Sequence, residues 1–138
     1  MDKALNYLAL AKKGRLIELG EETVGAITRA VKGRLVIVAS DASDHTWRRA
    51  KSFVAGTDQQ CLRVPFSKEE LGFVVGRTSL AIAAFTDAAM ALAFVKALPD
   101  QEKVKEVRET LDAKSQKLRQ RKDEAKAHER NVRLGKKK

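Results

Sequence analysis

The histidines, the cysteine and the acidic pairs are the residues whose types could support catalysis or hold a metal. His45 and His128 are the only histidines, and more than half of the chain separates them. We expect His45 in the exposed first turn of a helix, and we expect Cys61, the only cysteine, to pack as a small hydrophobic residue. The sequence has no Gly-x-Gly-x-x-Gly or phosphate-loop motif. We therefore predict that the protein is not an enzyme and uses no cofactor.

Asp41 and Asp44 are a candidate metal pair, because they follow a strongly apolar stretch. Carboxylates at the end of a buried strand can bind a cation. Their spacing suits a helix start better, where a side-chain oxygen accepts a hydrogen bond from an unpaired backbone N–H. We favour helix capping and predict no metal site.

A different chemistry is indicated by Gly20, Glu21, Glu22 and Thr23, which open a stretch of helical periodicity. The first N–H groups of a helix have no partner within the helix, and the helix dipole attracts anions to them. Gly20 lets another molecule approach the backbone closely. Glu21 and Glu22 have two interpretations, either stabilisation of the helix start or contact with a ligand.

The net charge of +10 and the sequence pI near 9.9 favour a polyanionic partner. Contacts to nucleic-acid phosphates release condensed counterions, so basic proteins of this kind usually bind RNA or DNA. The alternative is a surface charge that serves solubility alone. Residues 1–100 hold 14 Lys and Arg against 11 acids, whereas residues 101–138 hold 14 against 7. The charge is therefore concentrated in the C-terminal segment.

Apolar residues alternate between helical and strand spacing along the first 98 residues. The run 34–40 is rich in β-branched residues, which is typical of a strand buried on both faces. Strands that alternate with helices predict one three-layer domain with helices on both faces of a sheet. The predicted helices are 6–13, 21–32, 42–55, 67–76 and 87–98, and the predicted strands are 15–19, 34–40, 61–66 and 79–85.

Several residues mark the expected ends of these helices. Ser67 and Glu70 form a capping-box pattern, and Asp87 begins the last helix of the domain. Gly14 and Gly33 follow helical stretches and are expected to end them.

Pro99 separates the predicted domain, residues 1–98, from a basic tail, residues 99–138. We expect the domain to fold without the tail. A thin apolar stripe suggests that the first part of the tail extends a helix that packs on the domain or on a partner; its members are Val104, Val107, Leu111 and Leu118. Residues 130–138 are expected to be disordered in the free protein and available to phosphates. In this interpretation the tail adds affinity and the domain adds selectivity.

The single cysteine excludes an internal disulfide and fits a reducing compartment. Lys12 and Lys13 interrupt the N-terminal apolar stretch, so we predict no signal peptide. No apolar run approaches the roughly 20 residues that span a bilayer. We therefore expect a cytoplasmic protein with no membrane partner.

The segments 8–46 and 64–87 resemble the ribosomal-protein family typified by archaeal L-seven-Ae and eukaryotic L-thirty. The resemblance rests on the Gly20-Glu21-Glu22 turn, on "LVIVASDAS" at 35–43 and on "SKEELG" at 67–72. It is greatest to the small bacterial members of the family and extends from about Leu5 to Leu98. It implies an α/β/α sandwich around a four-stranded mixed sheet.

The same resemblance implies binding to kink-turns, which are sharply bent RNA motifs. Family members insert the start of one helix into the widened groove and cover a flipped-out nucleotide with a loop, and bent RNA exposes base edges that a regular helix hides. The corresponding helix residues are Gly20, Glu21, Glu22, Thr23 and Ala26, and the loop residues are Gly76, Arg77, Thr78 and Ser79. Basic residues that could flank this site are Lys12, Lys13, Arg15, Arg29, Lys32 and Arg34.

The chain departs from the pattern of the best-known kink-turn binders at three positions. Those proteins carry Asn-Glu or Lys-Gln where this chain has Glu22 and Thr23, and a lysine where it has Ala26. A carboxylate can accept hydrogen bonds from guanine N1 and N2, but it repels nearby phosphates.

We predict a protein that binds structured RNA, either a kink-turn-like motif or ribosomal RNA. It would work without catalysis in the ribosome or another ribonucleoprotein. The main alternative is a protein-interaction module that docks a partner through its helical tail. A third possibility is the substrate-binding part of an RNA-modifying enzyme.

Overall fold

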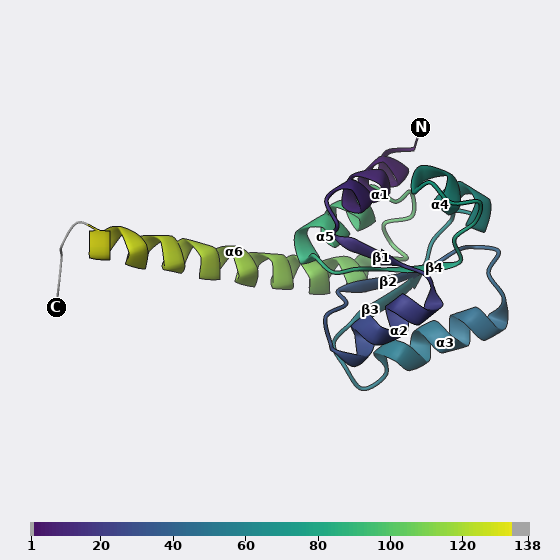
Figure 1. The fold of residues 1–138 in the computed structure, drawn as a ribbon, viewed down its shortest axis with the longest axis horizontal. Helices are drawn as coiled ribbons and strands as arrows, with labels where there is room; N and C mark the ends of the chain where they lie inside the picture. The colour runs from purple at the N-terminus through teal and green to yellow at the C-terminus, as the bar shows by residue number, and fades with distance from the viewer. Residues whose placement is uncertain (1, 134–138) are drawn as a thin grey trace.

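The computed structural model describes residues 2–133, with side chains through Ala127. Helices and strands alternate along the chain, as predicted, and a long helix follows them (Figure 1). The elements in chain order are α1 (Lys3–Lys13), β1 (Ile17–Leu19), α2 (Glu21–Arg29), β2 (Leu35–Val38), α3 (Asp44–Val54), β3 (Gln60–Arg63), α4 (Lys68–Val74), β4 (Ile82–Phe85), α5 (Ala88–Lys96) and α6 (Lys105–Arg133).

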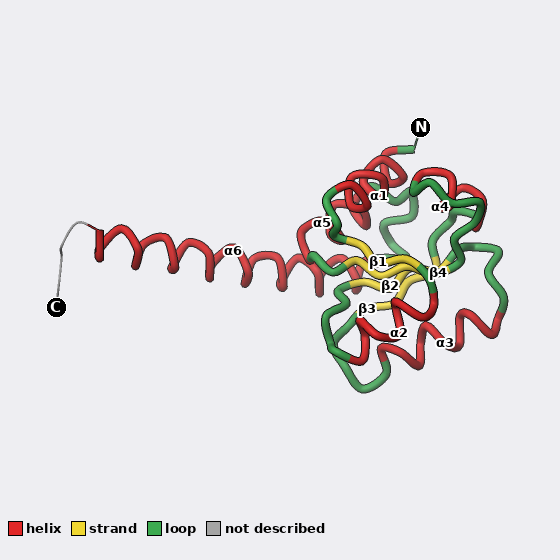
Figure 2. The backbone as a smooth tube through the Cα atoms, viewed as in Figure 1, coloured by secondary structure: helices red, strands yellow, loops and turns green. Residues whose placement is uncertain are grey.

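The four strands form one mixed sheet in the order β1-β4-β2-β3. Strand β4 is antiparallel to both of its neighbours, whereas β2 and β3 are parallel. Helices α1, α4 and α5 cover one face of the sheet, and α2 and α3 cover the other (Figures 1 and 2). The predicted three-layer α/β/α sandwich with a four-stranded mixed sheet is therefore confirmed.

The two central strands explain the apolar runs in the sequence. Every residue of β2 and β4 is buried, because helices cover both faces of the sheet. Phe85 at the end of β4 packs against Phe94 of α5, with ring centroids 5.1 Å apart. These contacts join the sheet to the helical layer formed by α1, α4 and α5.

Side chains cap the starts of four helices in the globular part, but α2 is different. The caps are Asp2 for α1, Ser43 for α3, Ser67 within a capping box for α4, and Asp87 for α5. Helix α2 begins after Gly20, which has no side chain to offer. The capping signals predicted at Ser67 and Asp87 are confirmed, and the start of α2 stays without a side-chain cap.

Helix α2 is shorter than predicted, because it ends at Arg29 and not at residue 32. Val31 takes a positive φ of 55°, its N–H donates to Thr28, and the next N–H, of Lys32, donates to the Ile27 carbonyl. This pair of hydrogen bonds is the Schellman arrangement that ends helices. Val31 is therefore half exposed, and the prediction that the helix continues through it to residue 32 is wrong.

Helix α1 ends in the same way, which explains why the first strand is shorter than predicted. Gly14 is the C-cap, as expected, but Arg15 is the residue with positive φ, at 59°. The Leu16 N–H donates to the Ala11 carbonyl over 2.8 Å. Arg15 thus belongs to the turn that ends α1. The strands predicted at 34–40 and 79–85 are likewise shortened to β2 and β4. The strand predicted at 61–66 becomes β3, which begins one residue earlier and ends at Arg63.

Helix α6 runs for 29 residues, and its first part packs on the domain. Val104 and Leu111 are buried in the same core as the sheet, and Val107 packs against that core. Beyond this part the helix projects away from the domain (Figure 1). The stripe predicted to pack on the domain or on a partner therefore packs on the domain, and the boundary between residues 98 and 99 stays a prediction.

The predicted disorder of residues 130–138 falls partly on α6, which continues to Arg133. Residues 134–138 lie outside the described part of the chain. No helix within residues 2–133 combines the length and apolar character needed to cross a bilayer.

Removing the docked part of α6 should weaken the fold more than removing its projecting part. Cutting the chain after Leu98 deletes Val104 and Leu111, and burial of one such side chain contributes about 1.5–3 kcal/mol. We expect residues 1–98 still to unfold cooperatively, with a free energy of unfolding lower by roughly 2–5 kcal/mol. A chain cut after Gln120 should match the full-length protein within about 0.5 kcal/mol in urea unfolding. Equal stabilities of the two truncated chains would contradict this account.

Candidate nucleic-acid interface

The turn at Gly20 presents unpaired backbone donors at the start of α2. Gly20 has φ 94° and ψ 152°, a conformation open essentially to glycine alone, so a side chain here would cost on the order of 1–3 kcal/mol. The Val24 N–H makes the first helical bond, to the Gly20 carbonyl. Among the described residues, nothing accepts from the N–H groups of residues 21–23, so a ligand can accept from them.

Arg77 lies beside this turn, as the candidate site requires. Its Nη1 is 3.6 Å from the position that a Cβ on Gly20 would occupy. Residues 76–79 are all exposed. The structure thus brings together the helix start and the loop that the sequence singled out, although they lie far apart in the chain.

The loop 76–79 is held firmly against α4. Gly76, with φ 78°, ends that helix, and the Arg77 N–H donates to the Gly72 carbonyl over 2.8 Å. A Cβ on Gly72 would lie only 2.7 Å from the Ser79 Cα, so the loop backbone packs directly on the helix. Because of this packing, Arg77 starts from a fixed backbone position.

Glu21 and Glu22 differ in their surroundings. Glu21 pairs with Arg49 of α3, with Oε1 and Nε 3.4 Å apart, and both side chains are about half exposed. An exposed pair of this kind contributes at most about 1 kcal/mol. Glu22 and Thr23 are exposed on the same turn. Glu22 is therefore the acid better placed for contact with a ligand.

Arg49 is a cation near the site that the sequence did not single out. Its guanidinium lies over the Phe53 ring, 5.2 Å from the centroid, and Phe53 packs against Gly25 of α2. Two helices meet here because Gly25 leaves room for the ring. Only this packing between helices brings Arg49 to Glu21, so a local sequence signal could not have identified it.

The opposite end of α2 is fixed by Gln59, which is buried. Its Oε1 accepts from the Gly33 N–H over 2.9 Å, and its Nε2 donates to the Thr28 carbonyl over 3.1 Å. The Thr28 hydroxyl in turn donates to the Val24 carbonyl over 2.9 Å. Buried polar groups that are fully paired hold elements in one arrangement. Gln59 therefore sets the orientation in which α2 presents its N-terminus.

The basic residues expected to flank the site lie away from the Gly20 turn. They are Lys12, Lys13 and Arg15 at the end of α1, Arg29 and Lys32 at the end of α2, and Arg34 just before β2. The Arg34 N–H donates to the Phe85 carbonyl. The end of α1 leads to Ile17, which pairs with Phe85 at the other end of β4 from Gly20. The nine residues of α2 separate its two ends by about 13 Å. Arg77 is thus the predicted cation that adjoins the turn.

Of the candidate catalytic and metal residues, Asp41 has a structural role and Cys61 is partly buried. Asp41 accepts from the Lys68 N–H over 2.8 Å and so caps α4, while Ser43 caps the helix that begins at Asp44. Within the described residues, no cluster of three potential metal ligands occurs. Burial raises the pKa of the Cys61 thiol to about 12, an effect that the nearby Lys51 charge only partly offsets. The thiol therefore stays protonated and is a poor nucleophile.

Arg63 at the end of β3 is another cation that the sequence did not single out. Its guanidinium lies over the Trp47 ring, 5.1 Å from the centroid. In the described part of the chain, its Nε and Nη2 are buried and have no hydrogen-bond partner. The guanidinium is instead stabilised by its cation–π contact with the Trp47 indole.

Comparison with known proteins gives one curated relative of named activity. The RNA-binding protein YlxQ of Enterococcus faecium is 32% identical over 75 residues, which are 54% of this chain and 72% of the relative. No model of a protein family matches the sequence.

Two solved structures share the fold. A protein of unknown function from Bacillus halodurans C is 27% identical, with a TM-score of 0.64 over 70% of this chain and 97% of that one. The Giardia lamblia 15.5kD RNA binding protein is 17% identical, with a TM-score of 0.59 over 76% of this chain and 87% of that one. The second similarity concerns the fold alone.

The match to YlxQ carries the assignment, because the identity extends over most of that relative. The chain belongs to the family of the RNA-binding protein YlxQ.

Proposed function

We propose that the protein binds structured RNA containing a sharp bend, such as a kink-turn or a similar motif in ribosomal RNA, and catalyses no reaction. The observation that carries this proposal is the Gly20 turn, with three unpaired N–H groups beside the Arg77 guanidinium. The name of the relative YlxQ supports RNA as the ligand. We place the protein in the cytoplasm, in the ribosome or another ribonucleoprotein, as the resemblance to small bacterial ribosomal proteins suggests.

The start of α2 offers both charge and hydrogen bonds to RNA. Its N–H groups and the positive end of the helix dipole attract a phosphate. The Thr23 hydroxyl can donate to a base edge or accept from one. The exposed Glu22 carboxylate can accept from guanine N1 and N2, groups that a sharp bend makes accessible. This end of the helix therefore accounts for the selectivity.

Arg77 and its loop supply the second half of the interface. The guanidinium can bind a phosphate with two parallel hydrogen bonds or stack on an unpaired base. The loop backbone is fixed against Gly72, so ordering the loop on binding costs little. Residues 76–79 are the segment that covers a flipped-out nucleotide.

At Ala26 the interface lacks a cationic side chain. It is exposed one turn into α2, where the best-known kink-turn binders have a lysine. Arg49, held against Glu21 by α3, places a cation at this end of α2 from a different helix. In this proposal Arg49 compensates for the missing lysine.

The alternative of a protein-interaction module has less support. The apolar stripe that would dock a partner is already packed on the domain through Val104 and Leu111. The projecting residues 121–127 have alanine as their only apolar residue type. These residues thus lack the a/d pattern of a coiled coil.

Arg77→Ala should weaken binding to a bent RNA by about 1–3 kcal/mol, the scale of one stacking or charged contact. Arg48→Ala is the matched control, since Arg48 is exposed on α3 and its loss removes the same charge. Fluorescence-anisotropy titration of both variants measures the difference. If the two substitutions have the same effect, Arg77 contributes only through overall charge.

Glu22→Lys distinguishes the two roles of the acidic turn. If Glu22 contacts guanine edges, the substitution should reduce the preference for bent over regular RNA, even while the added charge strengthens binding overall. If Glu22 only stabilises the helix start, the preference should persist and stability should fall by a few tenths to about 1 kcal/mol. We expect the first outcome. Parallel titrations with the two RNAs, combined with thermal unfolding, separate these cases.

A further inference from the structure

Residues of α1, α5 and α6 line an open hollow of about 350 Å³. Helices α1 and α5 lie on the face of the sheet opposite α2 (Figure 1). Three cations from three different helices line the hollow, namely Lys3, Lys96 and Arg119. Tyr7 and Ser115 add hydroxyl groups to the same lining. The hollow shares no residue with the Gly20–Arg77 site.

Helical spacing and the docking of α6 bring these residues together. Lys3 and Tyr7 are four residues apart in α1, and Ser115 and Arg119 are four residues apart in α6, so each pair shares one side of its helix. Ser115 is only 5% exposed, which shows that this turn of α6 still packs on the domain. The hollow therefore exists only because α6 is docked.

The charges around the hollow are not neutralised by the protein. No carboxylate lines it, and among the described residues Lys3, Lys96 and Arg119 form no ion pair. The other flank of α6 is different, because there Lys114 lies 3.3 Å from the Asp58 carboxylate. Three like charges around one hollow repel one another, and an anion bound among them would relieve that repulsion.

We propose that this hollow binds a backbone phosphate of RNA, as a second contact separate from the α2 site. The inference rests on the proposed function for the identity of the polyanion. Lys3 and Lys96 act as point charges, and Arg119 offers its planar set of donors to the phosphate oxygens. The Tyr7 hydroxyl is the hydrogen-bonding group suited to the adjoining ribose.

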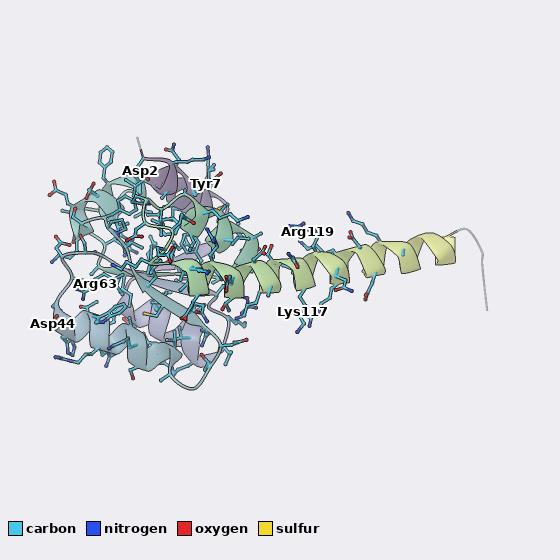
Figure 3. All side chains as sticks on the ribbon, turned by 180° about the vertical axis from the view of Figure 1, so that it is seen from behind. Asp2, Tyr7, Asp44, Arg63, Lys117 and Arg119 are labelled. Carbon is cyan, nitrogen blue, oxygen red and sulfur yellow. The ribbon has the colours of Figure 1, made fainter. Side chains whose placement is uncertain are left out.

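The projecting part of α6 favours RNA over a membrane surface. Figure 3 shows Lys117 and Arg119, which come just before the projecting part, on opposite sides of the helix. A helix that lies in a membrane interface segregates a charged face from an apolar one. Residues 121–127 present no apolar face, and all of their side chains are exposed. Cations on several sides of a helix suit a polyanion that passes around it.

The separation of the two sites determines which RNA can reach both. A domain of about 100 residues has a radius of gyration near 13 Å. The path along its surface from the α2 site to the hollow is therefore longer than an RNA that consists of a short bend alone. An RNA with one long flanking stem can cover it. The contribution of the hollow should therefore appear only with an extended RNA.

The test compares the double variant Lys96→Gln/Arg119→Gln with the control Arg48→Gln/Lys105→Gln, which removes the same charge from exposed positions elsewhere. Each protein is titrated with a bent RNA of minimal stems and with the same RNA carrying a stem of about 16 base pairs, the span of a double-stranded RNA-binding domain. For the extended RNA, Kd should rise about fivefold or more, and the salt slope should fall by about one per lost contact. For the minimal RNA, variant and control should agree.

Equal effects of the two double variants on the extended RNA would overturn the proposal and leave the α2 site intact. If the full-length protein shows no preference for bent RNA, the proposed function fails. In that case, binding of the double variant and of its control to an unbent duplex still tests the hollow. A membrane ligand is tested with phosphatidylcholine vesicles that contain phosphatidylglycerol. If the double variant loses vesicle binding while its RNA binding is unchanged, the hollow binds lipid and the proposal is overturned. If thermal unfolding shows that the Lys96→Gln/Arg119→Gln variant does not fold, the variant Lys3→Gln/Lys96→Gln replaces it.

Discussion

The hydrogen bond from the Gly20 N–H to the Ile82 carbonyl, 3.0 Å long, joins the two segments on which the interface depends. It continues the antiparallel pairing of β1 with β4, so the start of α2 and the loop before β4 lie at the same end of the sheet. Gly20 alone can take the backbone conformation that turns from this strand directly into the helix. Three unpaired N–H groups and the Arg77 guanidinium meet there as a consequence.

The rest of the domain holds these two segments in place. Gln59, in the loop before β3, makes hydrogen bonds to the C-terminal end of α2. Gly72 lets the 76–79 loop pack directly on α4. Neither contact touches a ligand in the proposed complex. They pre-organise the interface, which lowers the ordering cost of binding. Helix α6 has a different role. Its packing on the domain through Leu111 brings cations of three helices together in a second basic surface.

Local patterns in the sequence predicted the architecture and the helix starts, because hydrophobic periodicity and capping residues act over a few residues. The buried run at β2 and the capping residues Ser67 and Asp87 are examples. The helix ends at Arg15 and Val31 were not predictable, since these residues rarely take positive φ and the hydrogen bonds of the surrounding turn impose it. The approach of Arg49 to Glu21 and the hollow beside α6 depend on packing between elements, which no local pattern encodes. The roles of the site residues in binding stay a prediction.

The most direct test of the central claim is an NMR titration of the full-length protein with a bent RNA and with a regular duplex. We expect the bent RNA to shift the amide resonances of residues 20–23, at the turn with the unpaired N–H groups, and of residues 77–79 in the adjoining loop. The regular duplex should shift these resonances less and act mainly on the basic residues of α6. If bent RNA leaves both segments unshifted while other surfaces respond, the interface is elsewhere, and the resemblance to kink-turn-binding proteins concerns the fold alone.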